Sequence, residues 1–129
     1  MGLALNPDRA VDEIPAGHPQ VTIAGFGRFG QIGARLLLAQ RIAFVALETD
    51  AQQVDFMRRF GNQIYFGDPT RAELLRAAHA DRAEVFVLAT DDPEATLRPA
   101  RLVKRRFAHL RLYSRAPHPP DAIPLTDLD

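Results

Sequence analysis

Three glycines, at positions 25, 27 and 30, form the clearest chemical motif of this sequence, Gly-x-Gly-x-x-Gly. Residues without side chains permit a tight turn at Gly25, a close backbone approach at Gly27 and close helix–strand packing at Gly30. The motif follows the apolar run 21–24 and opens a segment with apolar residues at helical spacing. Because the N–H groups at the start of a helix are unpaired, this arrangement attracts an anion such as a phosphate.

An acidic residue, Glu48, ends the second apolar run, about 20 positions after the glycines. A carboxylate at this place accepts hydrogen bonds from ribose hydroxyls. It also repels a 2′-phosphate, so the pattern favours NAD or an adenosine nucleotide over NADP. The alternative is a glycine-rich turn in a similar fold that has lost its ligand.

Polar and small residues follow the other apolar runs as well. In an open α/β sheet, ligands bind beyond the carboxyl ends of the strands, so these residues would converge on one crevice. We expect an adenine ring near Asp68 and Thr70, and a phosphate near Arg28 as a charge-assisted donor. Helix capping is the alternative role for Asp68. The candidate nucleotide-binding residues are Gly25, Phe26, Gly27, Arg28, Phe29, Gly30, Glu48, Thr49, Asp50, Gly67, Asp68, Thr70, Ala89, Thr90, Asp91 and Arg115.

Short apolar runs alternate with amphipathic segments along the chain. Strict alternation with short connections requires a parallel sheet, because each parallel connection needs a crossover. The pattern therefore predicts an α/β fold: a Rossmann-like, doubly wound parallel sheet of about five strands with helices on both faces. The predicted strands are 21–24, 42–47, 64–66, 85–89 and 110–113.

Helix boundaries carry local signals. Thr70 and Glu73 predict a capping box that opens the third helix. Gly61 is a stop signal for the second helix. Asp92 as N-cap and Pro93 at the first helical position predict the start of the fourth.

Proline distribution divides the chain into three parts. Residues 1–19 are interpreted as a linker or leader, residues 20–116 as a nucleotide-binding domain, and residues 117–129 as an irregular Pro-rich tail. No apolar run approaches the roughly 20 residues that span a bilayer, so the fragment is expected to be soluble.

Composition argues against several function classes. The 129 residues carry a formal net charge of zero, which is not typical of a nucleic-acid-binding domain. The absence of Cys excludes thiolate nucleophiles and Cys-based zinc sites, and the four histidines lack ligand spacing. We therefore expect neither a catalytic nor a metal site.

Three strings resemble a known family: VTIAGFGRFGQ at 21–31, YFGDPTR at 65–71 and ATDDP at 89–93. They are similar to the RCK/KTN (TrkA-N type) regulatory domains of potassium transport proteins, above all the Kef-type, glutathione-regulated efflux antiporters. The resemblance covers about residues 20–116. It implies a phosphate loop formed by Gly25, Gly27, Arg28, Phe29 and Gly30, a ribose contact at Glu48, adenine near Asp68 and Thr70, and Arg115 facing the phosphates.

The resemblance also implies a role. Such a domain binds AMP or NAD(H) without catalysis, forms a homodimer, and gates a membrane-embedded potassium transporter module of the same parent chain. It lies on the cytoplasmic face of the inner membrane. This sequence departs from the family in having Glu48 where relatives often have Asp, and a Pro-rich tail in place of a further helix and a sixth strand. The tail leaves open whether the usual dimer surface and a glutathione site are present, and an excised or truncated domain is one interpretation of the chain.

Two other functions fit parts of the pattern. One is the NAD-binding domain of a dehydrogenase that lacks its substrate domain, since the glycine motif and Glu48 would serve it equally well. The other is a purely structural or dimerisation module. A regulatory domain is the leading hypothesis, because a complete nucleotide crevice occurs without a recognisable catalytic group.

Overall fold

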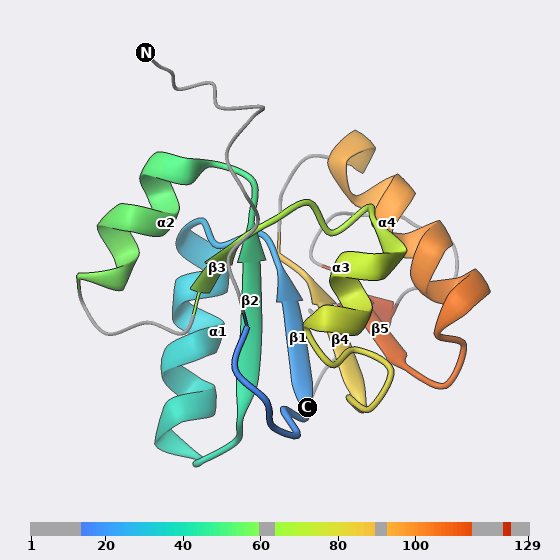
Figure 1. The fold of residues 1–129 in the computed structure, drawn as a ribbon, viewed down its shortest axis with the longest axis horizontal. Helices are drawn as coiled ribbons and strands as arrows, with labels where there is room; N and C mark the ends of the chain where they lie inside the picture. Colours follow the sequence, from blue (N-terminus) through green and yellow to red (C-terminus); the bar gives the residue numbers. More distant parts are fainter. Residues whose placement is uncertain (1–13, 60–63, 90–92, 115–122, 125–129) are drawn as a thin grey trace.

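A parallel sheet flanked by helices forms the fold (Figure 1). The computed structural model describes residues 14–59, 64–89, 93–114 and 123–124. The strands are β1 (Val21–Ala24), β2 (Phe44–Glu48), β3 (Ile64–Phe66), β4 (Val85–Leu88), β5 (Arg111–Ser114) and β6 (Ile123–Pro124). The helices are α1 (Arg28–Ala39), α2 (Ala51–Arg58), α3 (Ala72–Ala77) and α4 (Pro93–Arg106).

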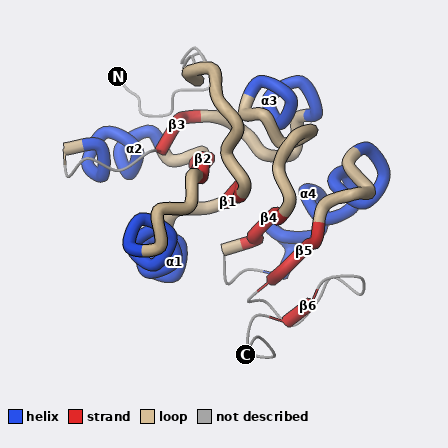
Figure 2. Tube along the Cα trace, turned by 90° about the horizontal axis from the view of Figure 1, so that it is seen from below, coloured by secondary structure: helices blue, strands red, loops and turns tan. Residues whose placement is uncertain are grey.

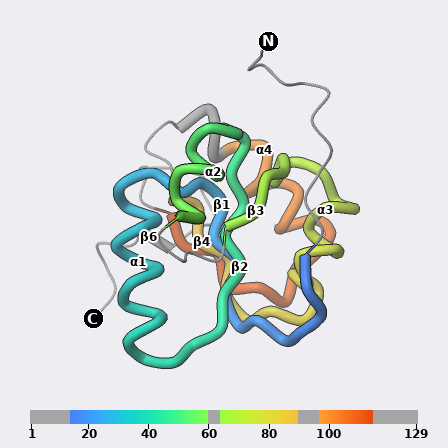
Figure 3. Tube along the Cα trace, turned by 60° about the vertical axis from the view of Figure 1, so that its left-hand side comes forward, coloured from blue at the N-terminus to red at the C-terminus, as the bar shows by residue number. Residues whose placement is uncertain are grey.

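The strand order is β3-β2-β1-β4-β5-β6, and every pairing is parallel. β1 lies at the centre, and the chain runs outward from it first through β2 and β3 and then through β4, β5 and β6. Helices α1 and α2 cover one face of the sheet and α3 and α4 the other (Figures 2 and 3). The predicted doubly wound α/β fold is confirmed. The strand order reverses beside β1, and in sheets of this kind ligands bind beyond the carboxyl ends of the strands at such a reversal.

Two apolar clusters hold the layers together. Phe26, Ile23 and Ile64 are fully or almost fully buried between the sheet and the α1–α2 layer. Phe86 and Leu75 occupy the corresponding place on the α3–α4 side. The central strands are mostly apolar because both of their faces are covered; Thr22 in β1 and Glu48 at the end of β2 are the exceptions. Within the described ranges, no helix is both long and apolar enough to cross a membrane.

The tail beyond residue 116 contains a strand that the sequence analysis did not predict. Ile123 pairs with Tyr113 and Pro124 with Ser114, which adds β6 to the sheet in parallel. The prediction of an irregular tail is therefore wrong at these two residues, and the sheet has six strands where about five were expected. Proline lacks an N–H donor, but it is tolerated on an outermost strand that need not donate outward.

The start of α3 also differs from the prediction. Arg71 is the N-cap of α3 and no side chain caps this helix, so the capping box of Thr70 and Glu73 is not formed. The Thr70 hydroxyl instead donates to Asp68 Oδ1 at 2.7 Å. α4 begins at Pro93 as predicted, whereas Gly61 and Asp92 lie outside the described residues.

Two helices end on a non-glycine residue in the left-handed conformation. Arg41 follows α1 with φ 58°, and His79 follows α3 with φ 67°. At the end of α1, Ile42 N donates to Leu37 O at 2.8 Å and Arg41 N donates to Leu38 O at 3.1 Å. This is a Schellman ending, whose left-handed residue is usually glycine because a Cβ is strained there.

Replacing Arg41 by glycine is expected to raise the free energy of unfolding by about 1 kcal/mol, because the strain of the Cβ is removed. Urea unfolding of the two proteins measures the difference. His79→Gly is the matched comparison, and it should gain less, because His79 Nε2 donates to Pro15 O at 2.8 Å. Lower stability of the Arg41→Gly variant would contradict the strain argument.

Candidate functional site

The glycine loop joins β1 to α1 with the backbone geometry that the motif predicts. Gly25 has φ 95°, a conformation that side chains disfavour. Gly27 is the N-cap of α1, and no side chain caps the helix. A Cβ added at Gly27 would meet nothing within 4 Å, so the backbone here borders open space. Gly27, as the N-cap, thus contributes no side-chain hydrogen bond to the first turn of the helix.

Gly30 allows α1 to lie against the end of β1. A Cβ at this position would lie 2.6 Å from the carbonyl oxygen of Gly25 and 3.5 Å from the Cβ of Ala89. Only glycine fits this contact without a shift of the backbone. The three glycines therefore have the three roles expected from their spacing: a turn, an open approach and close packing.

Three candidate residues continue the hydrogen-bond ladder at the carboxyl edge of the sheet, the upper edge in Figure 1. Gly25 N donates to Leu47 O at 2.8 Å, Gly67 N to Glu48 O at 3.0 Å, and Ala89 N to Ala24 O at 2.9 Å. The ends of β1, β2, β3 and β4 thus stand side by side. Folding brings candidates from four separate parts of the sequence to one edge.

The half-buried carboxylate of Glu48 lies directly beside the glycine loop. Oε1 accepts from the N–H of Phe26 at 2.7 Å, and Oε2 accepts from the N–H of Asp50 at 2.9 Å. Each carboxylate oxygen can accept more than one hydrogen bond, so both retain capacity for ribose hydroxyls. The side chain therefore also ties the loop to the start of α2.

A residue outside the candidate set, Gln53, contacts the same loop from α2. Its Nε2 donates to the carbonyl oxygen of Phe26 at 2.8 Å, and Gln31 Nε2 approaches the same oxygen at 3.5 Å. Sequence reasoning missed Gln53 because no motif marks it. Its half-buried position in the first turn of α2 becomes apparent only when the helix is placed against the loop.

Candidates after β2 and β3 make local backbone contacts. Asp50 is the N-cap of α2, and its Oδ1 accepts from Gln52 N at 3.0 Å and from Gln53 N at 3.3 Å. Asp68 Oδ1 accepts from Thr70 N at 2.9 Å, which shapes the turn before α3. Both aspartates are exposed. The oxygens of both aspartates thus stabilise the local backbone after β2 and β3.

The remaining candidate residues differ in how far their side chains are exposed. Phe26 is fully buried in the core, so only its backbone belongs to the loop. Arg28 and Thr49 are exposed, and Phe29 is half-buried against the α1–α2 cluster. Gly67 is buried, and a Cβ there would overlap Leu74 of α3. Thr90, Asp91 and Arg115 lie outside the described residues.

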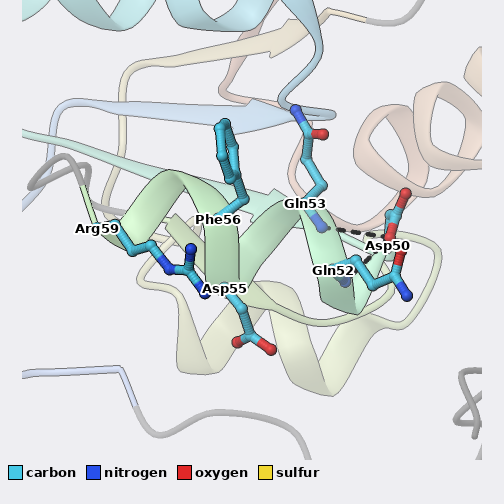
Figure 4. A pocket seen from close by; sticks show the side chains of 6 residues that line it. All are labelled: Asp50, Gln52, Gln53, Asp55, Phe56 and Arg59. Atoms are coloured by element: carbon cyan, nitrogen blue, oxygen red, sulfur yellow. Dashed lines mark hydrogen bonds between the residues drawn. The ribbon is translucent and has the colours of Figure 1, made fainter.

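A hollow of about 500 Å³ borders the site on the α2 side (Figure 4). The side chains that line it project from α2 and its two flanking residues, and Phe56 is the one aromatic residue among them. Among the described residues, no group of three or more His, Asp or Glu is arranged to hold a metal ion. The lining residues are Asp50, Gln52, Gln53, Asp55, Phe56 and Arg59.

Comparison with known proteins gives a family match over most of the chain. The family model of the TrkA-N domain matches residues 21–128. The glutathione-regulated potassium-efflux system protein KefC of Salmonella arizonae is 45% identical over 108 residues, which are 84% of this chain and 17% of KefC. The chain thus spans less than a fifth of the length of the curated relatives it matches.

Solved structures show the same fold. The Kef CTD of Shewanella denitrificans, solved in an AMP-bound form, is 36% identical with a TM-score of 0.63, over 73% of this chain and 56% of that one. The GsuK channel bound to NAD is 17% identical with a TM-score of 0.69, over 84% of this chain and 20% of that one. At that identity, the second likeness concerns the fold alone.

Proposed function

The chain belongs to the TrkA-N domain family, and on this premise we propose that it is a nucleotide-sensing domain of a potassium transport system. The observation that carries the proposal is the pairing of an uncapped glycine loop with the Glu48 carboxylate, whose oxygen lies 2.7 Å from the loop amide of Phe26. A donor surface for phosphate and an acceptor for ribose are then adjacent. The role is regulatory binding, not catalysis.

The proposed ligand is an adenine nucleotide, AMP or NAD(H). The backbone from Gly25 to Gly30, together with Arg28, would hold the phosphates, and Glu48 would accept from the ribose. Asp68 and Thr70 would border the adenine, and the other candidates would complete the binding site. The AMP-bound state of the Kef CTD and the NAD-bound state of GsuK support this ligand class.

The proposed partner is a membrane-embedded potassium transporter module, with the domain on the cytoplasmic side as a homodimer. Likeness to KefC supports a potassium efflux system. Residues 20–116 would form the binding unit. A nucleotide that binds one conformation more tightly shifts the population toward it, and this shift would be passed to the membrane module.

Isothermal titration tests the proposal on the purified domain with AMP, ADP, NAD and NADH. We expect saturable binding of at least one of them at one site per chain. If none binds at millimolar concentration, the sensing role is excluded and only the fold stands. Turnover of NADH with a panel of carbonyl substrates would indicate a dehydrogenase instead.

Glu48 also predicts discrimination between NADH and NADPH. A 2′-phosphate would lie against the carboxylate, which is already held in place by two N–H groups. Repulsion between like charges should weaken NADPH binding at least tenfold, about 1.4 kcal/mol. Competition titration with both nucleotides measures the ratio. Equal affinities would place the ribose away from Glu48.

A further inference from the structure

We propose that Gln53 is a positioning residue for the phosphate loop, through which α2 sets the direction of the Gly27 amide. The proposal rests on the function proposed above and adds a residue that neither the glycine motif nor the acidic position includes. Its basis is the hydrogen bond of 2.8 Å from Gln53 Nε2 to the carbonyl oxygen of Phe26.

The geometry of a peptide unit links this carbonyl to the neighbouring amide. The C=O of Phe26 and the N–H of Gly27 belong to one planar unit, and in a trans peptide they point in opposite directions. No peptide bond among the described residues is cis. By holding the carbonyl toward α2, Gln53 turns the Gly27 N–H to the opposite side, away from α2.

The preceding peptide unit is held as well. The N–H of Phe26 donates to Glu48, and the carbonyl of Gly25 packs against α1 at Gly30. Two successive units of the loop therefore have fixed orientations. In the second unit, the carbonyl of Phe26 is also approached by Gln31 Nε2 of α1, but the distance of 3.5 Å is too long for a strong hydrogen bond. The hydrogen bond from Gln53, at 2.8 Å, is the stronger of the two.

A chain of hydrogen bonds connects Gln53 to the ribose candidate. Glu48 accepts from the N–H of Asp50, Asp50 accepts from the N–H of Gln53, and Gln53 donates to the loop. Glu48 and Gln53, the two ends of this series of hydrogen bonds, contact the N–H and the carbonyl of Phe26, so the start of α2 is held to the loop. A ligand that displaces the loop would therefore displace α2 as well. In the nucleotide-free protein, the loop N–H groups proposed to bind phosphate would already point in the binding direction.

The test is the affinity of the purified domain for AMP and for NADH after Gln53→Met. Methionine has nearly the same length as glutamine and lacks the donor, so the packing is kept and only the hydrogen bond is lost. We expect affinity for the nucleotide that binds the wild-type protein to fall about five- to tenfold. Gln40→Met is the matched control: this exposed glutamine caps the end of α1 opposite the loop, and the variant should bind as the wild type does.

A second measurement separates the positioning role from general stability. In the nucleotide-free protein, the Gly27 amide should exchange faster and shift its NMR resonance in Gln53→Met but not in Gln40→Met, with the unfolding midpoint nearly unchanged. If the wild type binds nucleotide and Gln53→Met binds it equally well, the inference is wrong while the proposed function stands. If the wild type binds no nucleotide, the proposed function fails. If the exchange rate and NMR resonance of the Gly27 amide do not change in Gln53→Met, Gln53 does not orient the loop and the inference is wrong.

Discussion

Gly30→Ala is expected to lower the free energy of unfolding by about 2–3 kcal/mol and to abolish measurable nucleotide binding at micromolar concentration. The added Cβ would lie 2.6 Å from the carbonyl oxygen of Gly25, and backbone cannot yield as a flexible side chain can. Either α1 moves away from β1 or the Gly25 turn opens. Both changes displace the amides at the start of α1. Urea unfolding and isothermal titration measure the two effects.

Gly33→Ala provides the control on the same helix. A Cβ at Gly33 would meet nothing within 4 Å, and glycine in a helix interior costs about 0.5–1 kcal/mol relative to alanine. This variant should therefore be more stable than the wild type and bind nucleotide normally. If the two glycine variants behaved alike, close packing at Gly30 would not be the reason for a glycine there.

Glu48→Gln is the second substitution with a large expected effect. The amide can keep one acceptor oxygen, but its NH2 group must then face one of two N–H donors, Phe26 or Asp50. Loss of a hydrogen bond to a charged group should cost about 1.5–3 kcal/mol of stability. Nucleotide affinity should fall at least tenfold, because the ribose loses an ionised acceptor. Chemical unfolding and titration with AMP or NADH measure both.

Glu73→Gln is the matched control for removal of a carboxylate. Glu73 is exposed on α3, and its contact with Arg71 is 3.9 Å long. Exposed pairs of this kind contribute little, so stability should change by less than about 0.5 kcal/mol and binding should not change. A Glu48 variant that binds nucleotide normally despite lower stability would leave the carboxylate a structural role only.

Sequence reasoning succeeded where a residue type has one dominant physical use. Spacing alone placed Gly25, Gly27 and Gly30 at the turn after β1, and it placed Glu48 at the end of the neighbouring strand. Alternation of apolar runs with amphipathic segments sufficed for the parallel sheet, because each crossover needs a helix. These inferences depend on the period of the apolar pattern and on the fact that glycine has no side chain.

Sequence reasoning failed where several possible partners compete for one hydrogen-bonding group or where the partner lies far along the chain. Thr70 has the spacing of a capping residue, but the nearer carboxylate of Asp68 takes its hydroxyl. Prolines in the tail masked the pairing of Ile123 with Tyr113, which depends on a neighbour far along the chain. Gln53 could not be found because its hydrogen bond crosses 27 residues and ends on a backbone carbonyl.

Pro124 has a consequence for how the protein behaves in concentrated solution. It ends the last strand in the sheet order, and a proline cannot donate a hydrogen bond to an incoming strand. Because β6 has only two residues, few backbone groups at this edge could pair with an added strand. At this edge, the sheet is therefore poorly suited to adding strands from other copies of the protein.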